Sequence, residues 1–402
     1  MDFGIVEIIS LLMGLQGFGV TPDPKAPTPD ASLQYAIPDA DVVGHVDIAS
    51  LVPGNYKVLM GLPDQPAIKA SPDLQKLVKK AINEVEGPRG MAKGMIGLDP
   101  VTDLNDATLF LQVVPHHDPN FVAIAHGKFG TATIDKIGKL MNKPTIKVGS
   151  AAWVDSGDGP AVGITKDGVL IAGTPLLVKE RIADTWKSPP HGPGTNLGYA
   201  ADVLAQKPVF AFVLTMSQTA RTEAMKNMPK TPNFATDIIT RHKAASLSVF
   251  ADGIGWQWAD SKAGGLDSMA SISEGLVDIF RAAQIAPRGF AKIVLGGLDS
   301  YKGASKQVDA LLAHKADVLK IVDTYTGDGS FKVKIDKDPK ALKLNVRLTG
   351  KSLSEVLPLG MVVPMGAVGF LMARGRAAEP MEMNGFPMPT TPAPAPVPKK
   401  KP

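Results

Sequence analysis

Hydrophobic and polar positions along the chain predict strands that pair as hairpins and alternate with amphipathic helices. Apolar runs in residues 35–190 are separated by polar turns such as Lys166-Asp167-Gly168, and the same order returns in residues 199–351 with a turn at Asp252-Gly253. Asp-Gly pairs are common in tight hairpin turns. The expected strands are residues 42–48, 107–114, 121–129, 151–154, 161–165, 169–172, 208–216, 245–251, 255–259, 290–295, 331–335 and 342–348.

The clearest helical pattern covers residues 71–85. A serine suits the cap, Pro72 fits the first turn, and the Gly-Pro pair at 87–88 is expected to end the helix. Its apolar face includes Leu77 and Val78, which we expect to be buried. Further helices are expected at residues 133–141, 175–186, 218–226, 234–242, 266–283 and 302–325.

This order of elements predicts an α+β fold made of two related halves of antiparallel sheet with helices on one face. Residues 187–198 are rich in Pro and Gly, so we place the boundary between the halves there. The shared order indicates a diverged internal duplication. The expected parts are residues 1–34 (apolar segment and Pro-rich linker), 35–190 (first half), 199–351 (second half), 352–375 (apolar segment) and 376–402 (Pro-rich tail).

Apolar segments near the two ends are candidates for contact with a membrane or a partner. Residues 3–20 place Ile5, Ile8 and Leu12 on one helical face, which suits packing on the core or lying on a membrane. No Lys or Arg precedes this run, unlike in a secretory signal. Residues 356–373 are uncharged and reach the minimum length of about 17 residues for a membrane span. The candidate contact residues are Val356, Met361, Val363, Met365, Phe370 and Met372.

Two alternatives remain open for residues 356–373. Pro358 and Pro364 each remove an amide donor, so the segment could be a buried strand and loop instead of a membrane span.

Residues 376–402 alternate Pro with small residues, a composition that cannot build a core. We therefore expect a disordered tail.

Composition excludes several classes of function. The 402 residues contain no Cys, which rules out disulfides, thiolate-zinc sites and Cys nucleophiles. The net charge is +4, but the charges are spread along the chain instead of forming a basic patch. We therefore expect no binding to nucleic acid.

Motifs for catalysis or metal binding are weak. The sequence has neither the Gly-x-Ser-x-Gly of a nucleophile elbow nor a phosphate-binding loop, so we predict that the protein is not an enzyme and needs no cofactor. His116, His117 and Asp118 are potential ligands, but neighbours on an extended chain point to opposite faces. We therefore interpret them as a solvated hairpin tip and predict no metal site.

Trp256 and Trp258 are the candidate ligand-binding residues. They lie two positions apart on an expected strand, so they share a face and could line an aromatic groove. Large aromatic side chains also fill protein cores, and this is the alternative interpretation.

The first half resembles a broad, uncharacterised group of large bacterial envelope proteins. The likeness covers residues 35–182 and rests on YAIPDADVVGHVDIASL, GLDPVTDLNDATLFL, FVAIAHGKF and AVGITKDGVLIAGTPLLVKERI. These segments match a Pro-Asp-Ala start, a Gly-x-Asp-Pro turn and a Gly-x-Phe strand end. The resemblance implies an exported or membrane-associated protein and brings no catalytic residues.

Together these features predict a non-catalytic structural or interaction protein of the bacterial envelope, associated with a membrane surface or a protein assembly. The alternative is a binding module for an apolar ligand such as lipid. A cytoplasmic location is the alternative to the envelope.

Overall fold

The structure, a computed structural model, describes residues 29–350 except 65, 70–71, 158, 184–185, 227–233, 300–301 and most of 304–330. The expected apolar segments at both ends, the Pro-rich tail and most of the helix expected at 302–325 lie outside the described residues. All the elements below belong to one compact unit.

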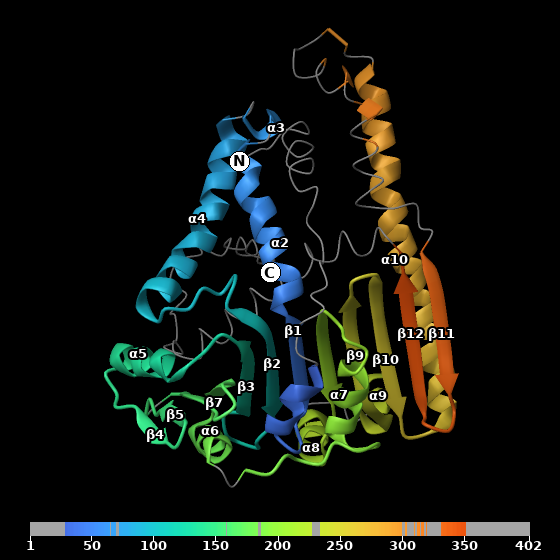
Figure 1. The fold of residues 1–402 in the computed structure, drawn as a ribbon. Helices are drawn as coiled ribbons and strands as arrows, with labels where there is room; N and C mark the ends of the chain where they lie inside the picture. The colour runs from blue at the N-terminus through green and yellow to red at the C-terminus, as the bar shows by residue number, and fades with distance from the viewer. Residues whose placement is uncertain are drawn as a thin grey trace, which may run out of the picture. The chain divides into compact units, whose positions relative to one another are not determined.

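The described strands form a single antiparallel sheet in the order β11-β12-β10-β9-β8-β1-β2-β3-β7-β6-β5-β4 (Figure 1). This confirms the α+β class. The strands are β1 (Val42–Asp47), β2 (Leu104–Gln112), β3 (Asn120–Gly127), β4 (Ile146–Val148), β5 (Ala151–Val154), β6 (Ala161–Ile164), β7 (Leu170–Gly173), β8 (Phe210–Thr215), β9 (His242–Phe250), β10 (Gly253–Asp260), β11 (Lys332–Asp338) and β12 (Lys343–Thr349).

The two expected halves meet inside this sheet. Strand β1 of the first half pairs with β8 of the second, and Gly44 lies opposite Phe212 at the centre of that pairing. The Pro- and Gly-rich segment 187–198 therefore connects two parts of one sheet, and its last residues already belong to a helix.

The halves also share strand lengths and register. Strands β1 and β8 each have six residues, β2 and β9 nine, and β3 and β10 eight. The β2–β3 and β9–β10 ladders each shift register just before the last pair at the same end, between Leu104 and Asp106 and between Ala259 and Asp260. In each half a helix follows, and the last strand of that half, β7 or β12, pairs with β3 or β10. The first half differs in having two further strands, β4 and β5, between its helix and its last hairpin.

Helices precede and separate these strands. Their bounds are η1 (Pro29–Tyr35), α2 (Ile48–Gly61), η2 (Leu62–Asp64), α3 (Pro66–Lys69), α4 (Pro72–Met95), α5 (Thr131–Met141), α6 (Pro175–Ile182), α7 (Asn196–Leu204), α8 (Gln218–Lys226), α9 (Phe234–Arg241) and α10 (Ala263–Leu298). The prediction of a strand at residues 290–295 is wrong, because these residues continue α10. A short apolar run fits a buried strand and one side of a helix equally well.

Helix α4 extends beyond its expected end. It continues through Pro88 to Met95, although a proline inside a helix typically costs about 3 kcal/mol. Arg89 offsets part of this cost, since its Nη2 lies 2.7 Å from Oδ2 of Asp99 in the loop that follows. That hydrogen bond holds the pKa of Asp99 well below its usual range. At the start of the helix, Val78 is buried against Leu62, as expected, whereas the Leu77 side chain lies outside the described residues.

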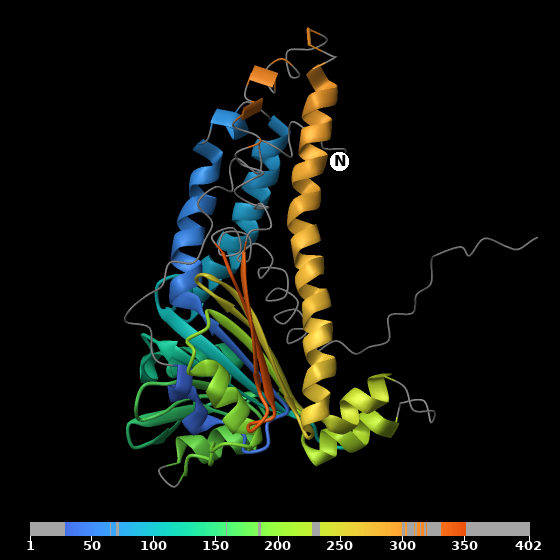
Figure 2. The ribbon, with the colours of Figure 1, turned by 90° about the vertical axis from the view of Figure 1, so that its right-hand side faces the viewer.

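Helices lie on both faces of the sheet, whereas the sequence pattern predicted helices on one face only. On β10, Trp256 contacts α10 through Ser273, while Ala259 packs on Tyr199 of α7. Residues an odd number of positions apart on a strand point to opposite faces, so α10 and α7 lie on opposite sides. In the first half, α6 and α5 divide in the same way. Figure 2 views the sheet close to edge-on and shows α10 along one side.

The face beneath η1, α6 and α7, here called the covered face, holds the main core. Phe110, Val122 and Ala211 from the central strands are fully buried there. Arg181 of α6 joins this helix to the end of η1, because its guanidinium donates to the main-chain carbonyls of Tyr35 and Ala36, and also to that of Leu177 in α6 itself. Burial lowers the pKa of Arg181 to about 10.

Candidate functional site

The opposite side of the five central strands carries three rows of apolar residues. Each row crosses β3, β2, β1, β8 and β9 with continuous pairing, so its members lie side by side. We call these rows the open face. The rows are Phe121, Leu111, Val42, Leu214 and Ala245; Ala123, Leu109, Gly44, Phe212 and Leu247; and Ala125, Ala107, Val46, Phe210 and Val249.

The residues of the open face are all apolar, yet most of them remain in contact with solvent. All except Val249 keep part of their surface exposed, and the directly paired Phe212 and Leu247 are 42% and 46% exposed. Neighbouring strands lie about 4.8 Å apart, which makes the face about 19 Å wide. Apolar patches of this kind on soluble proteins usually mark contact with a partner, a membrane or a ligand.

Two helices border the open face on the same side of the sheet. Helix α10 covers β10 and β12, where Trp256 stacks on Phe280 and donates from Nε1 to Oγ of Ser273 at 2.9 Å. Helix α5 packs on β5 and β6 through Ile134. The open face lies on the central strands between these two helices.

The tryptophans proposed from the sequence lie on β10, at the edge of the open face. Trp256 pairs with Leu247 but is only 6% exposed beneath α10, so it serves as core. Trp258 is partly exposed and its ring meets His242 edge-on at 5.7 Å between centroids. The structure therefore does not place the two rings in a shared aromatic groove.

The sequence pattern did not single out the open-face residues. Strands such as β8, with the sequence FAFVLT, are apolar at successive positions and predict burial on both faces. The signal that was available is this lack of alternation, because an antiparallel strand with one solvated face normally alternates apolar and polar residues.

A buried polar cluster lies on the covered face of the first half. Nδ1 of His45 is 2.9 Å from Oγ1 of Thr108, whose hydroxyl donates to Ser32. Beside them Nδ1 of His126 is 2.7 Å from Oδ1 of Asp106. Burial lowers the pKa of His45 to about 4, which keeps the ring neutral. Ser32 and Thr108 are fully buried, so neither hydroxyl can reach a substrate from solvent.

The histidines considered as metal ligands do not meet. His116, His117 and Asp118 are exposed in the turn between β2 and β3, whereas His126 stands near the far end of β3. Within the described part of the chain, no three acidic or histidine side chains come together in a way that could hold a metal ion.

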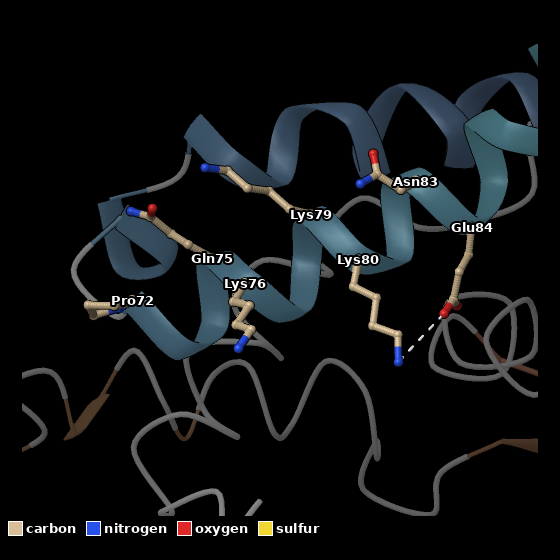
Figure 3. Close-up of a pocket in the computed structure, with 7 residues that line it drawn as sticks. All are labelled: Pro72, Gln75, Lys76, Lys79, Lys80, Asn83 and Glu84. Carbon is tan, nitrogen blue, oxygen red and sulfur yellow. Dashed lines mark ion pairs between the residues drawn. The ribbon is translucent and has the colours of Figure 1, made fainter.

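A surface hollow lies along α4 and is lined mostly by polar side chains. Figure 3 shows Lys79 pointing away from Lys76 and Lys80, and Lys80 pairs with Glu84 at 3.9 Å. The cationic groups do not converge on one point, and the pair is well exposed. This hollow therefore offers weak, solvent-screened charge instead of a built anion site.

The expected membrane-contact residues Val356, Met361, Val363, Met365, Phe370 and Met372 lie outside the described residues. Among the helices that the structure does describe, none is long and apolar enough to cross a membrane.

Comparison with known proteins gives little guidance. No family model matches the chain, and no curated protein matches it. Solved structures of a protein named TP0453 show a faint likeness. Crystal form III is 10% identical, covers 84% of this chain and 98% of its own, and has a TM-score of 0.32. Crystal form I is 11% identical, covers 81% and 96%, and has a TM-score of 0.31. Scores this low carry no conclusion about the fold or function of this chain.

Proposed function

We propose that the protein is a non-catalytic binding module for an apolar ligand, with the acyl chains of lipid held on the open face of the sheet. The observation that supports this most directly is the three apolar rows, which are partly exposed although the same strands have a complete core on their other side. Burying such surface releases roughly 25 cal/mol for each Å² removed from water. A ligand that covers the open face therefore gains affinity without polar contacts.

The chemistry of the open face favours hydrocarbon over a protein partner. None of the three rows contains a charged residue or a side chain that donates or accepts a hydrogen bond. The backbone groups of these strands already pair in the ladders. Protein interfaces usually carry about one hydrogen bond per 100–200 Å², whereas an acyl chain requires none.

A fluorescence titration with cis-parinaric acid, an unbranched fatty acid, tests this function. We expect saturable binding by the parent and at least about tenfold weaker binding by the double variant Phe212→Ser/Leu247→Ser, since tenfold corresponds to about 1.4 kcal/mol. Leu176→Ser on α6 is the matched control, because Leu176 is 65% exposed but lies outside the open face. We expect this control to bind like the parent.

Two outcomes contradict the proposal. One is the absence of saturable binding by the parent, or equal affinity of parent and double variant. The other is a light-scattering result in which the parent is a dimer and the double variant is a monomer. That result would identify a second copy of the chain as the occupant of the open face.

We also propose that the protein acts at the bacterial cell envelope in association with a membrane surface or an assembly, as the sequence resemblance implies. Carbonate-wash fractionation of cells that express the full chain tests this location. We expect the protein in the membrane fraction. A protein found wholly in the soluble fraction contradicts the location and leaves the lipid-binding proposal standing.

We further propose a common origin for the two halves. Equal lengths of three successive strands and register shifts at the same step support it. Distant relatives of this chain provide the test. Half-to-half similarity that rises in profiles built from many relatives is expected, and similarity that vanishes in such profiles contradicts a duplication.

A further inference from the structure

Gly44 occupies the centre of the open face. It lies in β1 between Leu109 of β2 and Phe212 of β8, in the middle row of the three. A Cβ atom added at Gly44 would meet no atom within 4 Å. The middle row therefore contains a gap the size of one side chain, with large side chains on both sides.

None of the usual structural reasons for a strand glycine applies here. The pairing of β1 with both neighbours is continuous, so there is no bulge, and Gly44 is not among the residues with positive φ. The other described strand glycines are different, because an added Cβ would collide with neighbouring atoms. At Gly163, for example, it would lie 2.7 Å from Cδ1 of Ile182. Gly127, Gly173, Gly253 and Gly255 meet main-chain oxygen atoms in the same way.

Glycine in a central strand has a cost in stability. It loses more conformational freedom on folding than other residues and contributes no side chain to packing. Besides bulges, bends and close backbone contacts, strand glycines mark places where a ligand approaches the backbone. At Gly44 this last explanation is the one that fits the surroundings.

From the proposed acyl-binding function and this gap, we propose that Gly44 determines ligand specificity by admitting one unbranched acyl chain to the backbone of β1. The Cα atoms of Leu109 and Phe212 stand about 10 Å apart, two strand spacings, and carbon atoms in contact lie about 4 Å from one another. One polymethylene chain therefore fits between the two side chains. A methyl-branched chain is too wide to reach the same depth.

Competition against cis-parinaric acid tests this proposal in the parent, Gly44→Ala and Gly44→Val. Palmitate is the unbranched competitor and phytanate the methyl-branched one. We expect the parent to prefer palmitate, and Gly44→Val to bind palmitate about tenfold more weakly and to lose the preference. Gly44→Ala should be intermediate. The thermal midpoint of Gly44→Val should equal or exceed that of the parent, since valine favours strands.

The result that overturns the proposal is a folded Gly44→Val protein that binds palmitate as tightly and as selectively as the parent, while Phe212→Ser/Leu247→Ser still binds weakly. In that case the open face binds lipid without using the gap. A parent that binds neither competitor contradicts the function itself. If Gly44→Val fails to fold, Leu109→Trp fills the gap from the neighbouring strand, and the same two results apply to it.

Discussion

The covered and open faces of the central sheet are made by the same strands, yet they differ in what lies on them. Phe110 on β2 points to the covered face and is 0% exposed beneath η1, α6 and α7. Phe212 on β8 points to the open face and is 42% exposed. Equal apolar character therefore has two consequences. On one face it stabilises the fold, and on the other it leaves surface available to a ligand.

Different residues of the same strands therefore stabilise the fold and form the proposed binding surface. A sheet with one solvated face is stable when that face is polar, so the fold does not require an apolar open face. The covered face also contains the buried groups His45, Asp106 and Arg181, whereas the three rows of the open face contain no titratable residue. Substitution and pH should therefore affect the two faces differently.

The largest expected difference is between Phe110→Ala and Phe212→Ala. The first creates a cavity in the core and should lower the free energy of unfolding by about 3–5 kcal/mol. The second removes a side chain that is already partly in water and should change it by less than about 1 kcal/mol. Urea denaturation followed by circular dichroism measures both. Equal losses in the two variants would show that the open face is covered in solution, and would contradict the difference between the two faces.

The next largest effect is expected from acidification of the covered face. Burial lowers the pKa of His45 from 6.5 to about 4, so the unfolded chain binds a proton between these values that the folded chain does not. The contribution of this residue to the free energy of unfolding is therefore highest above pH 6.5, and it decreases by about 3 kcal/mol in total as the pH falls toward 4.

His45→Val is the matched variant for this measurement, because Val213 occupies the corresponding fourth position of β8. Denaturation at pH 7 and at pH 4.5 should show a smaller loss of stability in the variant than in the parent. An equal loss in both proteins would mean that His45 is protonated without penalty. Binding of a neutral apolar probe should not change over the range in which the protein stays folded.

Much of the fold could be predicted from alternation and turn residues. The strand patterns located β1, β2, β3, β6, β7, β8, β9 and β10 to within a few residues. Asp167-Gly168 lies at the turn between β6 and β7, and Asp252-Gly253 lies at the turn between β9 and β10. The pattern did not predict α2, whose first turn follows β1 directly after the capping side chain of Asp47. It also ended α4 too early, because the hydrogen bonds of Arg89 to Asp99 depend on tertiary contact.

The candidate site could not be predicted in the same way. Whether Phe110 or Phe212 is buried depends on which face η1, α6 and α7 cover, and the apolar sequences of both strands permit either. Trp256 and Trp258 stood out as aromatic residues, but α10 covers Trp256. Gly44 became informative only when its neighbours on β2 and β8 were known, because the meaning of a strand glycine depends on the space above it.

Photo-crosslinking with a diazirine-bearing palmitate identifies where the acyl chain binds, since the carbene inserts into whatever residue lies against the chain. We expect mass spectrometry to find the label on open-face residues such as Leu109, Phe212 and Leu247, and we expect excess unlabelled palmitate, present during irradiation, to prevent the labelling. Label that concentrates on α4 or on the exposed Leu176 of α6, or labelling that unlabelled palmitate does not prevent, would contradict lipid binding on the open face.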